Sequence, residues 1–221
     1  MFRVRSLLLF LVVLAMASLA CQLSSPFALT PTSTPVAKSG DTLFYDDFTN
    51  THSGWERFSS AEGTMDYDGS GYRFLVNALQ TNFCSTPGKL FKDVRMEVDV
   101  AKLSGPDENR IGLLCRFVEN NYYFFMVSSD GYYTIGKYIG GNAIQLGQSE
   151  MQYNESIHTG LAVNHLRADC RGDTLIFFVN GTPVAKAQDT DLTEGDVGLL
   201  AGTFSQPGVD AIFDNFVVLQ P

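Results

Sequence analysis

The first residues to consider for catalysis in this 221-residue sequence are two carboxylates, Glu97 and Asp99. Apolar and charged residues alternate around them, which predicts a strand with both carboxylates on one face. Hydrolysis of a glycosidic bond with retention uses two such carboxyl groups about 5 Å apart. The three histidines (His52, His158 and His165) lie far from one another, and no Gly-x-Ser-x-Gly elbow occurs. We interpret the pair as an exposed acidic strand face.

Aromatic and basic residues form a second set of candidates. Sugar recognition combines an aromatic surface with a few polar groups that fix the orientation of the ligand. The candidate ligand-binding residues are Arg116, Tyr122, Tyr123, Tyr133, Lys137, Tyr138 and Arg167. The alternative is that the aromatic side chains fill a core and that the arginines cover a sheet edge.

Most of these candidates lie in residues 111–138, where apolar runs are separated by Glu119-Asn120-Asn121 and by Asp130-Gly131. This pattern predicts an antiparallel meander. A two-residue turn at Asp130-Gly131 pairs Val127 with Thr134 and Tyr123 with Tyr138. Both faces of the hairpin are rich in aromatic residues, so we expect one face in the core and the other along a groove.

The sequence beyond residue 41 repeats short apolar runs between turn residues. Turns are expected at Gly140-Gly141, Gly172-Asp173 and Asn180-Gly181. The second turn places one apolar set on a single face: Leu166, Ala168, Cys170, Leu175, Phe177 and Val179. About a dozen short strands without a convincing helix predict an all-β fold, a two-sheet antiparallel β-sandwich.

The charge of the chain excludes some partners. Arg3, Arg5 and Lys38 precede the first acid, Asp41, so residues 41–221 carry twelve basic and twenty-four acidic side chains. Phosphate binding needs concentrated lysine and arginine, so the composition argues against nucleic acid. It also argues against electrostatic docking on anionic lipid.

The first twenty residues are typical of a signal peptide, with Arg3 and Arg5 before a short apolar run. The sequence Ser18-Leu19-Ala20-Cys21 resembles the lipobox of bacterial lipoproteins, with Ser18 where leucine is usual. That resemblance implies lipidation of Cys21 and a domain anchored at the bacterial cell surface, outside the cytoplasm. Cleavage by ordinary signal peptidase, or an uncleaved apolar anchor, is the alternative.

Three regions are therefore expected. Residues 1–20 are the signal peptide, residues 21–40 the lipidated cysteine with a linker rich in proline, serine and threonine, and residues 41–221 the β-sandwich. Such a linker buries too little surface to fold. The β-sandwich contains Cys84, Cys115 and Cys170, and export favours a disulfide. Three thiols allow three single pairings, or they stay reduced as small buried groups.

A succession of short motifs resembles the concanavalin A-like, laminin G-like jelly-roll superfamily. More narrowly, it resembles bacterial surface domains related to the 3-keto-disaccharide hydrolase domain. The resemblance covers nearly all of residues 41–221 in order. The motifs are YDDF at 45–48, GLLCRF at 112–117 with YYFF at 122–125, HLRADC at 165–170 with VNG at 179–181, GDVGL at 195–199, and FDNF at 213–216.

The resemblance carries several expectations about sites. It implies that Cys115 pairs with Cys170. Related glucanases carry E-x-D-x-(x)-E on one strand, and here Ala101 or Lys102 stands where the second glutamate belongs. They also hold a structural Ca²⁺ with carboxylates of the first and last strands, which here are Asp47 and Asp214. The alternative is that both acids accept backbone N–H bonds.

The expected function is non-catalytic carbohydrate binding, with a glycan or cell-envelope polymer as partner and no cofactor beyond that calcium. A carbohydrate-active hydrolase of the 3-keto-disaccharide type is the second hypothesis. A structural or protein-interaction module without a small ligand is the third. Superfamilies of this kind host all three, so the fold does not choose among them.

Overall fold

The computed structural model describes residues 39–221, which form sixteen strands. Ala37–Pro221 is a compact unit with its own hydrophobic core, as expected of a domain that folds on its own. Residues 1–38, and with them the predicted signal peptide and Cys21, lie outside the described part. Among the residues described, no helix is both long and apolar enough to span a bilayer.

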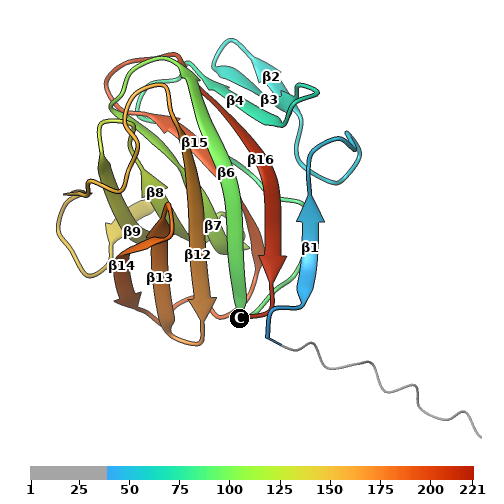
Figure 1. The fold of residues 1–221 in the computed structure, drawn as a ribbon, viewed down its shortest axis with the longest axis vertical. Coiled ribbons are helices and arrows are strands. Elements are labelled where there is room, and N and C mark those ends of the chain that lie inside the picture. Colours follow the sequence, from blue (N-terminus) through green and yellow to red (C-terminus); the bar gives the residue numbers. More distant parts are fainter. Residues whose placement is uncertain (1–38) are drawn as a thin grey trace, which may run out of the picture. The chain divides into compact units, whose positions relative to one another are not determined.

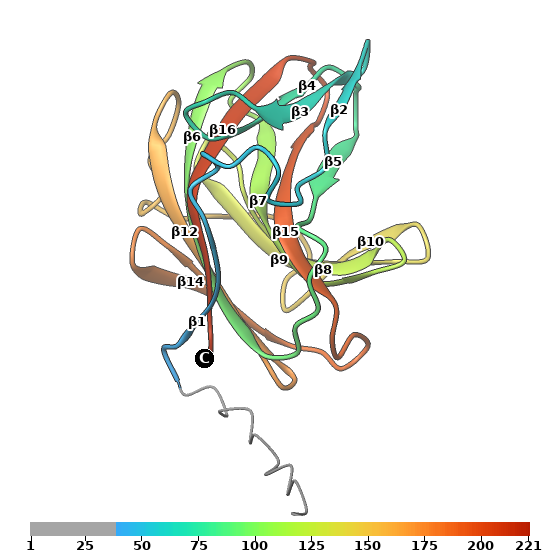
Figure 2. The same cartoon turned by 90° about the vertical axis from the view of Figure 1, so that its right-hand side faces the viewer.

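The strands form two antiparallel sheets (Figures 1 and 2). Sheet A contains β1 (Thr42–Asp46), β2 (Phe58–Ser60), β3 (Gly63–Tyr67), β4 (Tyr72–Val76), β6 (Val94–Ser104), β12 (Val163–Arg171), β13 (Thr174–Val179), β14 (Thr182–Gln188) and β16 (Val209–Leu219). Sheet B contains β5 (Asn82–Ser85), β7 (Asn109–Val118), β8 (Asn121–Val127), β9 (Tyr132–Ile139), β10 (Asn142–Gln145), β11 (Gln152–Tyr153) and β15 (Asp196–Thr203). The fold is the expected all-β sandwich.

The strand order explains how the layers are built. Sheet A runs β14-β13-β12-β6-β16-β4-β3-β2, and β1 pairs with β16 beyond the end of β4. Sheet B runs β10-β9-β8-β7-β15-β5, with β11 beside β9. Figure 1 looks onto sheet A with sheet B behind it, and Figure 2 shows the two layers after a quarter turn. The main core fills the space between them.

Two of the predicted turns are closed by two residues with positive φ. Gly140-Gly141 joins β9 to β10, and Asn180-Gly181 joins β13 to β14. The predicted Gly172-Asp173 turn pairs Arg171 with Thr174. The six residues assigned to the inner face of β12 and β13 are all buried in the core, as the alternation predicted.

The predicted register of the β8–β9 hairpin is wrong by one residue. Val127 pairs with Tyr133 rather than Thr134, and Tyr123 with Lys137 rather than Tyr138. The loop has three residues, because the Gly131 N–H donates to the Ser128 carbonyl and the Ser128 N–H to the Tyr132 carbonyl. Gly131, at φ +101°, is the left-handed residue that such a loop requires. One more loop residue moves every β9 side chain to the opposite face.

A disulfide between Cys115 on β7 and Cys170 on β12 joins the two sheets. Both half-cystines are fully buried in the main core. Cys84 on β5 is the free cysteine of the described residues. The bridge therefore ties sheet B, which carries the candidate site, covalently to sheet A.

Candidate functional site

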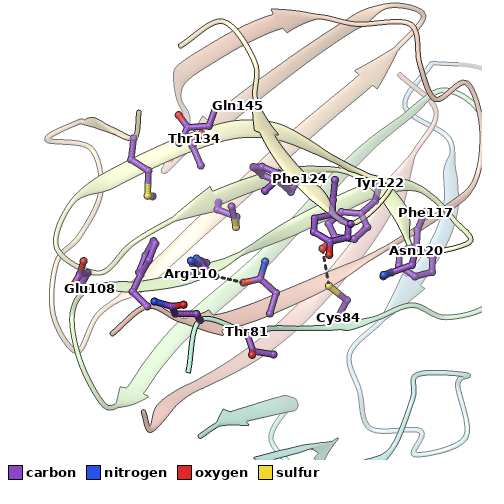
Figure 3. A pocket seen from close by; sticks show the side chains of 18 of the residues that line it. Thr81, Cys84, Glu108, Arg110, Phe117, Asn120, Tyr122, Phe124, Thr134 and Gln145 are labelled. Atoms are coloured by element: carbon purple, nitrogen blue, oxygen red, sulfur yellow. Dashed lines mark hydrogen bonds between the residues drawn. The ribbon is translucent and has the colours of Figure 1, made fainter. Parts of the chain in front are cut away.

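The candidate site is an open pocket on the outer face of sheet B, with a volume of about 1130 Å³ (Figure 3). Its floor is formed by side chains of β5, β7, β8, β9 and β10, and its rim includes Glu56, Gln80, Thr81, Glu108, Phe204 and Ser205. A pocket of this size is large enough for a small ligand or part of a chain.

Glycines on the outer face of sheet B let neighbouring side chains approach the backbone closely. Gly136, Phe124, Leu114 and Gly198 lie side by side across four strands, and each glycine leaves its place on the outer face without a side chain. The edge of the Phe124 ring occupies the place of a Gly136 side chain, since a Cβ there would lie 2.1 Å from it. The Phe124 ring therefore lies close to the β9 backbone at Gly136.

A row of three aromatic rings crosses the floor. Tyr122 lies between Phe117 and Tyr138, with ring centroids 5.7 and 5.3 Å apart and rings within 19° and 15° of parallel. Both faces of the Tyr122 ring are therefore covered. Only the outer rings of the row, Phe117 and Tyr138, remain partly exposed for stacking against a sugar.

The Tyr122 hydroxyl points over the floor toward β5, where it lies 3.7 Å from the Cys84 sulfur (Figure 3). Burial raises the pKa of Cys84 to about 11, and burial also raises the pKa of Tyr122. Both groups are therefore neutral near pH 7, and the Cys84 thiol has no thiolate character. They line the pocket as polar but uncharged groups.

The cation of the pocket is Arg110 on β7. Its guanidinium lies 4.0 Å from the centroid of the Phe204 ring, and Nη1 donates to Asn82 Oδ1 at 3.2 Å (Figure 3). Asn82 lies across β15 from Arg110 and occupies the space above Gly202. Burial lowers the pKa of Arg110, but an arginine remains charged at neutral pH.

Of the seven predicted ligand-binding residues, the structure brings Tyr122 and Tyr138 into this pocket. Tyr123, Tyr133 and Lys137 lie on the inner face, where the corrected register places the β9 residues. Tyr123 is fully buried, and Tyr133 packs against the main core. Lys137 forms ion pairs with Asp189 and Asp191 at 2.5 and 2.6 Å. Their assignment to a groove is wrong.

Arg116 is also misplaced by the prediction. It is skipped in the pairing of β7 with both neighbours and has φ +54°, so it forms a β-bulge. Its side chain is buried and donates to the carbonyls of Lys92, Leu192 and Gly172, with Asp93 at 3.4 Å. Strict alternation places this guanidinium outward, and the bulge turns it inward as a structural tie between loops.

Arg167 lies on the other sheet. On the outer face of β12 it stacks 4.2 Å from the centroid of Phe178 and binds Asp169 at 2.6 Å. Glu97 and Asp99 share that outer face, where His165 Nδ1 lies 2.8 Å from Asp99 Oδ1. The predicted carboxylate pair is therefore remote from the pocket on sheet B.

Sequence reasoning missed the residues that give the pocket its character: Asn82, Cys84, Arg110, Phe117, Phe124 and Phe204. Alternation alone indicates that Arg110 shares a face with Leu114, because they lie four residues apart in one strand. No local signal brings Phe204 or Asn82 to it, since they come from distant segments.

The two residues proposed for calcium, Asp47 and Asp214, accept hydrogen bonds from neighbouring residues. The strands YDDF and FDNF do pair, through β1 and β16. However, Asp47 accepts hydrogen bonds from the backbone and hydroxyl of Thr49, and Asp214 accepts one from the Asn215 backbone. No group of three potential His, Cys, Asp or Glu ligands exists within residues 39–221. Both acids therefore accept local hydrogen bonds, which is the alternative to a Ca²⁺ site that needs six to eight oxygens.

Comparison with known proteins gives the fold a name. No family model and no curated protein sequence matches this chain. A carbohydrate-binding module, CBM66 from Bacillus subtilis, superposes with a TM-score of 0.61 at 18% identity, covering 76% of this chain and 96% of that one. A Bacillus subtilis protein of unknown function with a galectin-like fold gives 0.62 at 13% identity over 84% and 98% of the chains.

A Bacillus licheniformis β-glucanase has the same architecture, with a TM-score of 0.60 at 10% identity over 83% of this chain and all of that one. At such identities the likeness concerns the fold alone. The chain therefore has the concanavalin A-like, galectin-like jelly-roll fold, which binding modules and glycoside hydrolases share.

Proposed function

We propose that residues 41–221 form a non-catalytic module that binds a glycan, such as a cell-envelope polymer, in the pocket on sheet B. The observation that carries the proposal is the open pocket itself, with an apolar floor beside fixed polar groups. Leu114, Tyr122, Phe124, Met126 and Leu200 form a second apolar cluster on this outer face. Phe117 and Tyr138 pack against this buried cluster and leave partly exposed aromatic surface that a ligand can cover. Such surface next to a few oriented polar groups is the usual composition of binding sites.

The fold supports the same proposal. CBM66 is a carbohydrate-binding module, and the β-glucanase is named for its carbohydrate substrate. Among the described residues that line the pocket, none of those on the strands of the floor is a carboxylate, because both acids of the lining, Glu56 and Glu108, lie on the rim. Paired carboxyl groups across a scissile bond are what hydrolysis requires, so the floor favours binding over turnover.

The direct test is binding of residues 37–221 to a glycan array, followed by titration of the best ligand. Tyr138→Ala removes a partly exposed ring of the aromatic row and is expected to weaken binding about tenfold, a cost of about 1.4 kcal/mol. Tyr153→Ala, at an exposed tyrosine outside the pocket, is the matched control and is expected to bind as the parent does. Silence across the array, or equal loss in both variants, would contradict the proposal.

A hydrolase of the 3-keto-disaccharide type is the second candidate, and the observation in its favour is that Glu56 and Glu108 both line the rim. Incubation with chromogenic glycosides and 3-keto-disaccharides separates the two functions. Turnover that is abolished by Glu56→Gln or Glu108→Gln, with binding retained, would replace binding by catalysis as the function.

We also propose that Cys21 is lipidated and holds the domain at the bacterial cell surface. The support is the lipobox-like sequence followed by a linker rich in proline, serine and threonine. Detergent-phase partitioning of the mature protein and a diacylglyceryl mass on Cys21 are expected. Partition to the aqueous phase with an unmodified Cys21 would show that the anchor does not exist.

A further inference from the structure

The arginines of the described residues differ in how their charge is neutralised. A carboxylate lies within 4.0 Å of each member of one group: Arg57, Arg73, Arg95, Arg116 and Arg167. Arg171 in the β12–β13 turn and Arg110 in the pocket have no such partner. Arg171 is exposed to water, whereas Arg110 is half-buried in the wall of a pocket. A cation without an opposite charge in a partly buried place costs free energy unless a ligand supplies the missing negative charge.

The position of Arg110 is fixed in advance. The Phe204 ring covers one side of the guanidinium, and Asn82 accepts one of its N–H bonds. The Asn82 side chain is itself held in place, because it packs into the space that the missing side chain of Gly202 leaves. A planar cation held by stacking and by one hydrogen bond loses little conformational freedom when it binds a ligand.

Most of the hydrogen-bonding capacity of Arg110 is unused. A guanidinium has five N–H donors, and one of them binds Asn82. The buried nitrogen and oxygen atoms without partners in the described residues are Arg95 Nε and Gln145 Oε1, so the remaining Arg110 donors are open to the pocket. A fork of parallel N–H groups matches the two oxygens of a carboxylate.

The nearby acids do not substitute for such a ligand. Glu108 lies on the rim, exposed, and its carboxylate is 3.5 Å from the Ser205 hydroxyl rather than within ion-pair distance of Arg110. The rim acids and the acidic composition of residues 41–221 repel a densely charged polyanion. They disfavour a single carboxylate much less, because solvent screens exposed charges over about 8 Å at physiological salt.

We propose that the pocket selects glycans with a carboxylate-bearing sugar, such as a uronic acid, and that Arg110 binds this carboxylate while the aromatic row contacts a neighbouring sugar. The inference rests on the proposed glycan-binding function and specifies its ligand class. Arg110 is a binding residue in this scheme, and Asn82 positions it.

The test is a glycan array that presents acidic oligosaccharides, their methyl esters and sulfated oligosaccharides side by side. Residues 37–221 are expected to bind carboxylated members and to bind the methyl ester of the best one about 10- to 100-fold more weakly, as for loss of a hydrogen bond to a charged group. Arg110→Gln is expected to bind the acid more weakly than the parent protein does, by the same factor, and to bind the ester with the same affinity as the parent protein. The affinity of Arg110→Lys for the acid is expected to lie between that of the parent protein and that of Arg110→Gln.

Arg167→Gln is the matched control, because Arg167 also stacks on an aromatic ring but lies on the opposite sheet. It is expected to bind the acid as the parent does. If Arg110→Gln does not fold, the comparison of acid with ester on the unaltered protein decides the question, since it needs no substitution.

Three results would overturn the inference and leave glycan binding intact: hits confined to neutral glycans, preference for sulfated members over carboxylated ones, or equal affinity for acid and ester. Unchanged binding of the acid by a folded Arg110→Gln variant would overturn the role of that residue. An array without any hit would remove the proposed function together with the inference.

Discussion

The outer faces of the two sheets differ in the side chains that they present to solvent. On sheet A, β6 and β12 alternate between buried and more exposed residues, and Asp169 on β12 pairs with Arg95 on the neighbouring strand and with Arg167 on its own strand. On sheet B, β8 and β15 are almost continuously buried, and an apolar cluster lies beneath the pocket. The arginines on this face of sheet A have carboxylate partners, whereas sheet B keeps an apolar floor and one cation, Arg110, without a carboxylate partner.

The difference shows how a face that binds can be told from a face that is only solvated. Both outer faces carry an arginine stacked on a phenylalanine, at 4.0 Å for Arg110 and 4.2 Å for Arg167. Only Arg167 also has a carboxylate partner. Stacking on an aromatic ring therefore does not distinguish the two arginines. What distinguishes them is whether the guanidinium N–H donors already have a carboxylate partner.

The largest effect is expected from the disulfide that holds the two faces together. Cys115→Ala with Cys170→Ala opens a loop of 55 residues and is expected to lower the free energy of unfolding by about 4 kcal/mol, measured by chemical denaturation. Intact mass after alkylation without reductant should show one labelled cysteine, Cys84, within residues 37–221. Three labelled cysteines, or unchanged stability, would contradict the bridge.

The next effect compares a buried arginine with a surface one. Arg116→Ala leaves the carbonyls of Lys92, Leu192 and Gly172 without their donor and is expected to cost about 3 kcal/mol of stability. Arg167→Ala removes an ion pair at the surface of sheet A and is expected to cost less than about 1 kcal/mol. Equal costs in urea denaturation would show that the two arginines play the same role.

How far the sequence predicts this structure depends on the regularity of each strand. The β12–β13 hairpin is predicted residue by residue, because its two-residue turn preserves strict alternation. The β8–β9 hairpin fails by one register step, because Asp130-Gly131 fits both a two-residue and a three-residue loop. At Arg116 a left-handed non-glycine residue creates a bulge that no local pattern announces.

The candidate site was less predictable than the fold for a different reason. The four candidate tyrosines are visible in the sequence as an aromatic cluster, and two of them, Tyr122 and Tyr138, do line the pocket. The importance of Arg110 lies in its tertiary surroundings, with Phe204 and Asn82 brought from distant segments and a carboxylate missing. Contacts and absences of this kind have no signature in a single sequence.

A smaller effect tests whether glycine shapes the floor of sheet B. Gly136→Ala is expected to cost about 2 kcal/mol, because its Cβ would overlap the Phe124 ring, and to weaken ligand binding by moving that ring. The Gly136→Ala, Phe124→Ala double variant is expected to lose less than the sum of the two single variants. Strict additivity in thermal unfolding would mean that ring and glycine do not share the space.

The smallest effect separates a partly buried ion pair from an exposed one by acid titration. Burial opposes ionisation of Asp189, but hydrogen bonds from Lys137 and Tyr123 outweigh it and lower its pKa; a hydrogen bond from Arg57 lowers the pKa of Asp66 on sheet A. A carboxyl whose pKa is lower in the folded state contributes stability above its unfolded pKa, near 4, and loses it as the pH falls further.

Asp189→Asn is therefore expected to flatten the fall in urea midpoint below about pH 4 more than Asp66→Asn does. The reason is that the Asp189 side chain is 11% exposed and the Asp66 side chain 46%, so solvent screens the second pair more strongly. Equal flattening by both substitutions would show that the ion pairs at the edge of sheet B are as solvated as those on the face of sheet A.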